Sequence, residues 1–365
     1  MLKRVINKDR IKTDLFMVGG GKNVNSCQRK SQRIPWIDIT KGLLILCLVY
    51  GHHKQFAMKC GMDDEVINFI QGSMLFYASF FMQTFFIITG LCSTFSIPLK
   101  NYVWKNVKTL VIPAILLSLL GNYVYDIFMG NSLSVIHVAE LSKWFITGAP
   151  WFIMALFWAK LAYWFIAKQN TNMQIAIVVV LYFIGLLLDM LNSFPNYMYH
   201  RHTLLLLPYL FGGVMLQKHF DQYEHYIKPL AIVALVALTL QTLLNTFCGF
   251  PFPVHDANIG ISFKSFPLHV VNVVLGTSLV FYISQKIAHN NFLQVMGKGT
   301  LLVYLLDVTV ENMALSVCSP IYNNTSLLTC VLFHGASFAL SIVIFYLLIR
   351  ITYSTKYLSW IVGKW

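Results

Sequence analysis

Charged residues are scarce in this sequence of 365 residues. They make up 11% of it, whereas hydrophobic residues make up 57% and aromatic residues 15%. A typical soluble domain carries about 25% charged residues. The chain has no long hydrophilic insertion between its apolar segments and no visible internal repeat. This composition excludes an ordinary soluble domain and indicates a membrane protein with a single large domain.

Cysteine patterns that bind metal are also lacking. The seven cysteines include no Cys-x-x-Cys pair and no Cys/His spacing suited to zinc, so we expect no metal site. Cys60, Cys248 and Cys318 fall near predicted outer helix ends, where oxidation is chemically possible. The sequence does not pair them, and we expect no disulfide.

Long apolar runs dominate the rest of the chain, and their length matches the thickness of a bilayer core. Backbone groups cannot stay unpaired in hydrocarbon, and the runs lack the alternation of a barrel strand. We therefore predict an all-α polytopic membrane protein with about ten transmembrane helices. The runs are 36–55, 72–95, 107–128, 147–167, 173–191, 203–217, 229–248, 267–286, 300–317 and 327–350.

Lysine and arginine orient this predicted bundle, because they are enriched in cytoplasmic loops. Most of the 27 basic residues fall on one side when the N-terminus is inside, and an even number of helices returns the C-terminus to that side. We expect both termini in the cytoplasm. The predicted organisation is a tail at 1–33, a membrane domain at 34–350 and a short tail at 351–365.

The net charge of +13 is concentrated in the segment before the first run. Its position favours anionic membrane lipid over nucleic acid as the partner. The segment has no apolar core or cleavage site typical of a signal peptide, and its glycine-rich, polar composition predicts a disordered tail. The sequence leaves the oligomeric state open.

Ionisable residues inside the runs are the main functional candidates. Each costs about 2.5–3.5 kcal/mol at the centre of a membrane helix on insertion scales, so it is usually retained for a reason. The candidates are Asp38, Lys41, His52, Asp126, Lys160, Asp189, Asp307, Glu311 and His334. Four of them are best interpreted as polar contacts between helices, namely Asp126, Lys160, Asp189 and His334.

The segment IDITKGLLILCLVYGHH, residues 37–53, places three of these residues on one helical stripe. Lys41 and His52 differ by about 1100° of rotation, which is about 20° from a common face, and Asp38 lies about 40° off in the other direction. His53 points about 100° away from that stripe. About 16 Å of helix separates Lys41 from His52, so one end suits an anion and the other suits proton transfer. A snorkelling lysine with a nearby acid and a solvated histidine remains the structural alternative.

This segment resembles the opening signature of the acyltransferase-three family of multispanning membrane O-acetylases. That signature has an acid, a base followed by glycine, and a Gly-His pair, matched here by Asp38, Lys41-Gly42 and Gly51-His52. Lys41 stands where arginine is commoner, which keeps the charge and loses the planar fork of a guanidinium. Further stretches that resemble the family follow in order: FFMQTFFIITG (80–90), KNVKTLVIP (105–113), PWFIMALFW (150–158) and MGKGTLLVYLLD (296–307).

The resemblance implies transfer of an acyl group, usually acetyl, from cytoplasmic acetyl-CoA or another acyl-CoA. The acceptor would be a hydroxyl on a sugar of a cell-envelope glycan or of its lipid-linked precursor, at a bacterial-type inner membrane. The phosphates of the CoA would lie near Lys41, Lys105 and Lys108. His52 would be the general base, with Asp38 and Lys41 on its stripe, and a covalent acyl-histidine is the less favoured variant.

Two further pairs have both a functional and a structural interpretation. Asp307 and Glu311 share one helix face at i,i+4, where one could orient His52 or the acceptor sugar, or both could bond neighbouring helices. The family usually has histidine at the position of Asp307. Trp151 and Phe152 could stack on a sugar or belong to the aromatic belt of the membrane interface.

A transporter or flippase is the alternative function, because proton-coupled carriers also place carboxylates at mid-membrane. The sequence has no repeated halves and no matched pair of broken, Gly/Pro-rich helices, which favours the acyltransferase. The acceptor sugar, its hydroxyl and the identity of the acyl group stay open at this point.

Overall fold

The structure is a computed structural model that describes residues 34–59, 72–131, 150–191, 199–248, 266–321 and 327–363. The chain divides into the units Met1–Pro35 and Trp36–Trp365, and the second unit holds the cavities and the polar cluster described below. The predicted tail at 1–33 and Cys60 lie outside the described residues.

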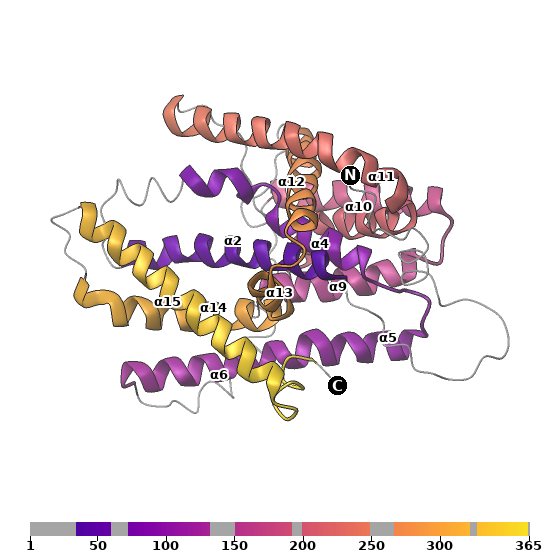
Figure 1. The fold of residues 1–365 in the computed structure, drawn as a ribbon. Coiled ribbons are helices and arrows are strands. Elements are labelled where there is room, and N and C mark those ends of the chain that lie inside the picture. The colour runs from indigo at the N-terminus through magenta and orange to yellow at the C-terminus, as the bar shows by residue number, and fades with distance from the viewer. Residues whose placement is uncertain are drawn as a thin grey trace. The chain divides into compact units, whose positions relative to one another are not determined.

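Every regular element in the described ranges is a helix, which confirms the all-α fold class (Figure 1). The elements are α2 (Pro35–Lys59), α4 (Phe81–Leu91), α5 (Leu99–Asn106), η1 (Val107–Val111), α6 (Ile112–Met129), α9 (Trp151–Ile166), α10 (Thr171–Leu191), α11 (His200–Cys248), α12 (Phe266–Lys286), α13 (Asn291–Lys298), α14 (Thr300–Cys318), η4 (Ser319–Ile321) and α15 (Leu327–Ser354).

Seven of the described helical segments are long and apolar enough to cross a membrane, so the chain is a polytopic membrane protein. They are Gly72–Leu91, Leu99–Met129, Thr171–Leu191, His200–Cys248, Phe266–Lys286, Thr300–Cys318 and Val331–Ser354. The segment Trp151–Ile166 is shorter but apolar. The count of about ten helices and the cytoplasmic position of both termini stay predictions.

The long helix α11 contains two of the predicted runs, 203–217 and 229–248. A straight helix of 49 residues would be about 73 Å long, more than twice the thickness of a hydrocarbon core. His219 interrupts it with non-helical backbone angles, φ −122° and ψ 25°. The interruption falls in the polar stretch between the two runs, as expected if each half crosses the membrane separately.

Two close crossings of helices explain glycines in the stretches that carry the family resemblance. A Cβ atom on Gly297 would lie 1.6 Å from the backbone oxygen of Asp38, and one on Gly42 would lie 2.2 Å from that of Leu293. Helices α2 and α13 therefore touch backbone to backbone beside Lys41. Small residues at such crossings are typical of membrane helix packing, because they let backbones approach.

Helices α4 and α11 cross in the same way at Gly90 and Gly213, which yields a first prediction. A Cβ atom on Gly213 would lie 2.0 Å from the backbone oxygen of Ile87, whereas one on Gly212 would meet nothing within 4 Å. Gly213→Ala should lower the free energy of unfolding by about 1–3 kcal/mol through overpacking. Gly212→Ala should leave it unchanged or slightly raised, since alanine favours helix. Thermal unfolding in detergent measures both, and equal melting of the two variants would contradict the crossing.

The segment predicted as a C-terminal tail, 351–365, begins within a helix. Helix α15 continues to Ser354, and Val362 beyond it is buried. A Cβ atom on Gly363 would lie 2.9 Å from the Cα atom of Thr109 in η1. The described part of this segment is therefore packed against the bundle.

Candidate active site

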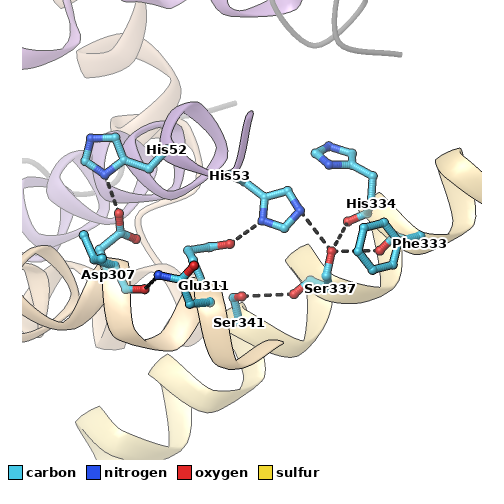
Figure 2. Close-up of polar contacts among 10 residues, drawn as sticks. His52, His53, Asp307, Glu311, Phe333, His334, Ser337 and Ser341 are labelled. Atoms are coloured by element: carbon cyan, nitrogen blue, oxygen red, sulfur yellow. Dashed lines mark hydrogen bonds and ion pairs between the residues drawn. The ribbon is translucent and has the colours of Figure 1, made fainter. Parts of the chain in front are cut away.

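Two consecutive histidines on α2 meet two acids on α14 (Figure 2). The Nδ1 atom of His52 contacts a carboxylate oxygen of Asp307, and the Nδ1 atom of His53 contacts one of Glu311. The acids are four residues apart, so they lie on one face about 6 Å apart along the axis. The two histidines point about 100° apart on α2, and each reaches a different acid.

Exposure separates the two pairs. The side chain of His52 is 36% exposed, although its partner Asp307 is 1% exposed. His53 and Glu311 are both 0% exposed. A substrate can therefore reach His52 without rearrangement of the helices, whereas the second pair is sealed inside the protein.

The sealed pair links three helices. The Nε2 atom of His53 lies 3.0 Å from the hydroxyl of Ser337 on α15, and that hydroxyl donates to the backbone oxygen of Phe333 at 2.7 Å. The tautomer of His53 decides whether the ring or the hydroxyl donates in their contact. The ring of His334 lies 4.5 Å from that of His53. The pair thus fixes the position of α2 against α14 and α15.

A cavity of about 250 Å³ ends one helical turn short of His52 and Asp307. Leu48, four residues before His52, and Tyr304, three residues before Asp307, both line it. Side chains on a helix lean toward its N-terminus, and α2 and α14 both run away from the end of the cavity that holds Lys41 and Lys298. His52 and Asp307 therefore project toward the end of this cavity that lies farther from Lys41 and Lys298. We call this space the donor cavity.

A second cavity of about 270 Å³ adjoins the donor cavity and shares Lys41 and Thr89 with it. Lys41, Lys105 and Lys160 line it together, on three different helices. Three cations around one space form a site for a polyanion. We call this space the lysine cavity.

Some of the other predicted site residues line these two cavities, and others do not. Lys108 lies beside Trp104, with its amine 5.2 Å from the ring centroid, and does not line the lysine cavity. Asp38 is buried at the crossing with Gly297 and lines neither cavity.

Trp151 and Phe152 do not form one sugar-stacking surface. The ring of Trp151 is partly exposed and lies 4.9 Å from that of His202. Phe152 is buried, 8% exposed, and lines the donor cavity. The interpretation of Phe152 as part of a sugar-stacking surface therefore does not fit its buried position.

The remaining polar candidates make contacts between or beside helices. Asp189 lies 3.6 Å from the guanidinium of Arg201, and Asp126 lies 3.4 Å from the side chain of Asn131. Within the described ranges, no group of three or more His, Cys, Asp or Glu residues could hold a metal ion.

The sequence did not single out three residues that lie at this site or line its cavities. His53 lies off the stripe of His52, but the i,i+4 pair of acids on α14 offers partners for two adjacent histidines. Lys160 was interpreted as a polar contact between helices, and it lines the lysine cavity. Ser337 gave no signal, since a lone serine in an apolar helix is common.

The fold and this site define a polytopic helical membrane protein with a partly exposed His–Asp pair one helical turn beyond a cavity between the helices. The model of the acyltransferase-3 family, described as an acyltransferase domain, matches residues 34–350. The chain therefore belongs to this family and is a membrane acyltransferase. Comparisons with curated proteins and with solved structures give no match.

Proposed function

We propose that the chain moves an acetyl group from acetyl-CoA to a hydroxyl of a cell-envelope sugar or glycan, with His52 as general base. The observation that carries this proposal is the contact of His52 with Asp307 one helical turn beyond a cavity whose other end adjoins three lysines. Lysines at one end and a histidine beyond the other end match a donor that has phosphates at one end and a thioester at the other.

The proposed chemistry needs one base and one leaving thiolate. A sugar hydroxyl is a weak nucleophile at neutral pH, so its oxygen needs a base within hydrogen-bond reach. Asp307 holds the Nδ1–H of His52, which makes Nε2 the nitrogen that removes the hydroxyl proton. The oxygen attacks the thioester carbonyl, the C–S bond breaks, and the thiolate of CoA takes the proton back from Nε2. The products are the sugar ester and CoA, with no net change in protons.

The donor would run along α2. About 16 Å separates Lys41 from His52 along the helix axis, a length that the flexible arm of CoA can follow. Lys41, Lys105 and Lys160 would bind its phosphates, and Lys108 lies outside this group. We assign the lysine end to the cytoplasm, from the charge bias of the loops. The acceptor, a glycan or lipid-linked sugar of a bacterial-type inner membrane, would approach the exposed face of His52.

The lysine cavity provides a test of the donor. Lys160→Met should raise the KM for acetyl-CoA about tenfold, because one of three cations around the phosphates is lost. It should leave the KM for acetyl-pantetheine, which has no phosphates, unchanged. Lys168→Met, which removes a lysine over the ring of Trp164 just past the same helix, is the matched control. Equal changes of KM for both donors would contradict phosphate binding at Lys160.

A further inference from the structure

We propose that residues 355–363, called the C-terminal segment below, form part of the donor site and contact the pantetheine arm of the acyl-CoA. The inference rests on the proposed function, because it concerns the acyl-CoA that would occupy the donor cavity. It gives a binding role to residues whose composition predicted only a short tail.

The C-terminal segment is attached on both sides to elements that line the donor cavity. Just before it, the hydroxyl of Tyr353 donates to the backbone oxygen of Lys298 at 2.6 Å. At its end, a Cβ atom on Gly363 would lie 2.9 Å from the Cα atom of Thr109. Tyr353, Lys298 and Thr109 all line the donor cavity. The segment therefore runs from one lining element, α13, to another, η1.

The C-terminal segment reaches the donor cavity through Val362. This side chain is 7% exposed and lines the cavity together with Lys41 and Lys298. Tyr357, five residues earlier, is 80% exposed and does not line the cavity. One part of the segment thus faces the donor cavity, whereas another part points away from the protein.

The backbone of the C-terminal segment holds Val362 in this position. Consecutive turns precede and include it, with the N–H of Ile361 donating to Leu358 at 3.1 Å and that of Gly363 donating to Trp360 at 3.0 Å. Gly363 has φ 78°, in the left-handed region that glycine favours and β-branched residues avoid. Because Gly363 also touches η1, a larger residue there should move Val362 out of the cavity.

The place of Val362 decides which part of the donor it would meet. The phosphates would lie in the lysine cavity and the thioester near His52, so the pantetheine arm between them would cross the donor cavity. Val362 lines the donor cavity and not the lysine cavity. The arm carries methyl and methylene groups as well as amides, and the same cavity offers the hydroxyls of Thr109 and Thr300 beside apolar side chains.

The test compares the KM for acetyl-CoA with that for acetyl-pantetheine, in membranes that carry the full chain and bacterial envelope glycan. Val362→Ala should raise both KM values about fivefold, because apolar contact with the arm is lost. Gly363→Val should raise both about tenfold. Lys160→Met, in contrast, should raise only the KM for acetyl-CoA. Inhibition by pantetheine gives the same comparison through its Ki.

The value of kcat separates binding from folding. Neither variant touches His52 or Asp307, so kcat per folded molecule should stay within about twofold of wild type. A merely structural role of the segment would lower the amount of active protein and leave both KM values unchanged.

Tyr357→Ala is the matched control, since Tyr357 is on the exposed part of the same segment and should leave both KM values unchanged. Unchanged KM values in Val362→Ala and Gly363→Val, a rise confined to acetyl-CoA, or a fall of either KM would overturn the inference while leaving the acyltransferase intact. A wild-type chain that uses neither donor would overturn the proposed function, and the inference with it.

Discussion

His52→Ala should lower turnover of acetyl-CoA per folded molecule by about 10²–10⁴-fold, the usual contribution of a general base. The KM for acetyl-CoA should stay close to that of wild type, because His52 does not line the donor cavity. The variant should fold, since the sealed contact of His53 with Glu311 still joins α2 to α14. Release of CoA thiol in membranes, normalised to inserted protein, measures the effect.

His289→Ala is the matched control for this variant. His289 is exposed and lies in the turn between α12 and α13, so its removal should leave turnover unchanged. Turnover of His52→Ala within threefold of wild type would remove His52 from the mechanism. In that case another group would have to take the proton of the acceptor.

The two acids of α14 should respond differently to loss of charge. Asp307→Asn should lower kcat by about 10²-fold, because the amide can donate to Nδ1 and so hold the proton of the ring on Nε2, where the base is needed. The KM for acetyl-CoA should be unchanged. Steady-state kinetics on the same membranes separate the two parameters.

Glu311→Gln is the paired comparison. Glu311 is sealed from substrate, so its loss of charge should leave kcat within about threefold of wild type. It should lower stability instead, by about 1–3 kcal/mol, because a buried hydrogen-bonded contact with His53 is weakened. Thermal unfolding in detergent measures this change. A larger fall of kcat for Glu311→Gln than for Asp307→Asn would reverse the roles assigned to the two pairs.

The sequence was sufficient to predict the helical membrane fold, because long apolar runs have few stable forms in a bilayer. It was less informative about the number of crossings. The polar residues of α2 lower its hydropathy, and α11 carries two runs in one helix that is interrupted at His219. The polar stretch between those runs marks the place of the interruption, but hydropathy does not show that the helix continues on both sides of it.

The site was harder to predict than the fold, because its geometry depends on contacts between distant helices. Helical geometry placed Lys41 and His52 on one stripe of α2, and Lys41 lines both cavities. That stripe says nothing of which acid meets which histidine, since Asp307 is 255 residues from His52. The same limit applies to Phe152, because the sequence pattern of an aromatic residue at a helix end is the same whether its ring faces lipid or a cavity.

The most direct test of the account is transfer of labelled acetyl from acetyl-CoA into envelope glycan, in membranes that carry the wild-type chain. Label is expected in an ester that mild base releases, formed in step with free CoA. Membranes with Asp307→Asn at equal insertion should form about a hundredfold less of it. Label that never enters glycan, while a sugar or lipid-linked sugar crosses the membrane with the chain present, would contradict the account and favour a transporter.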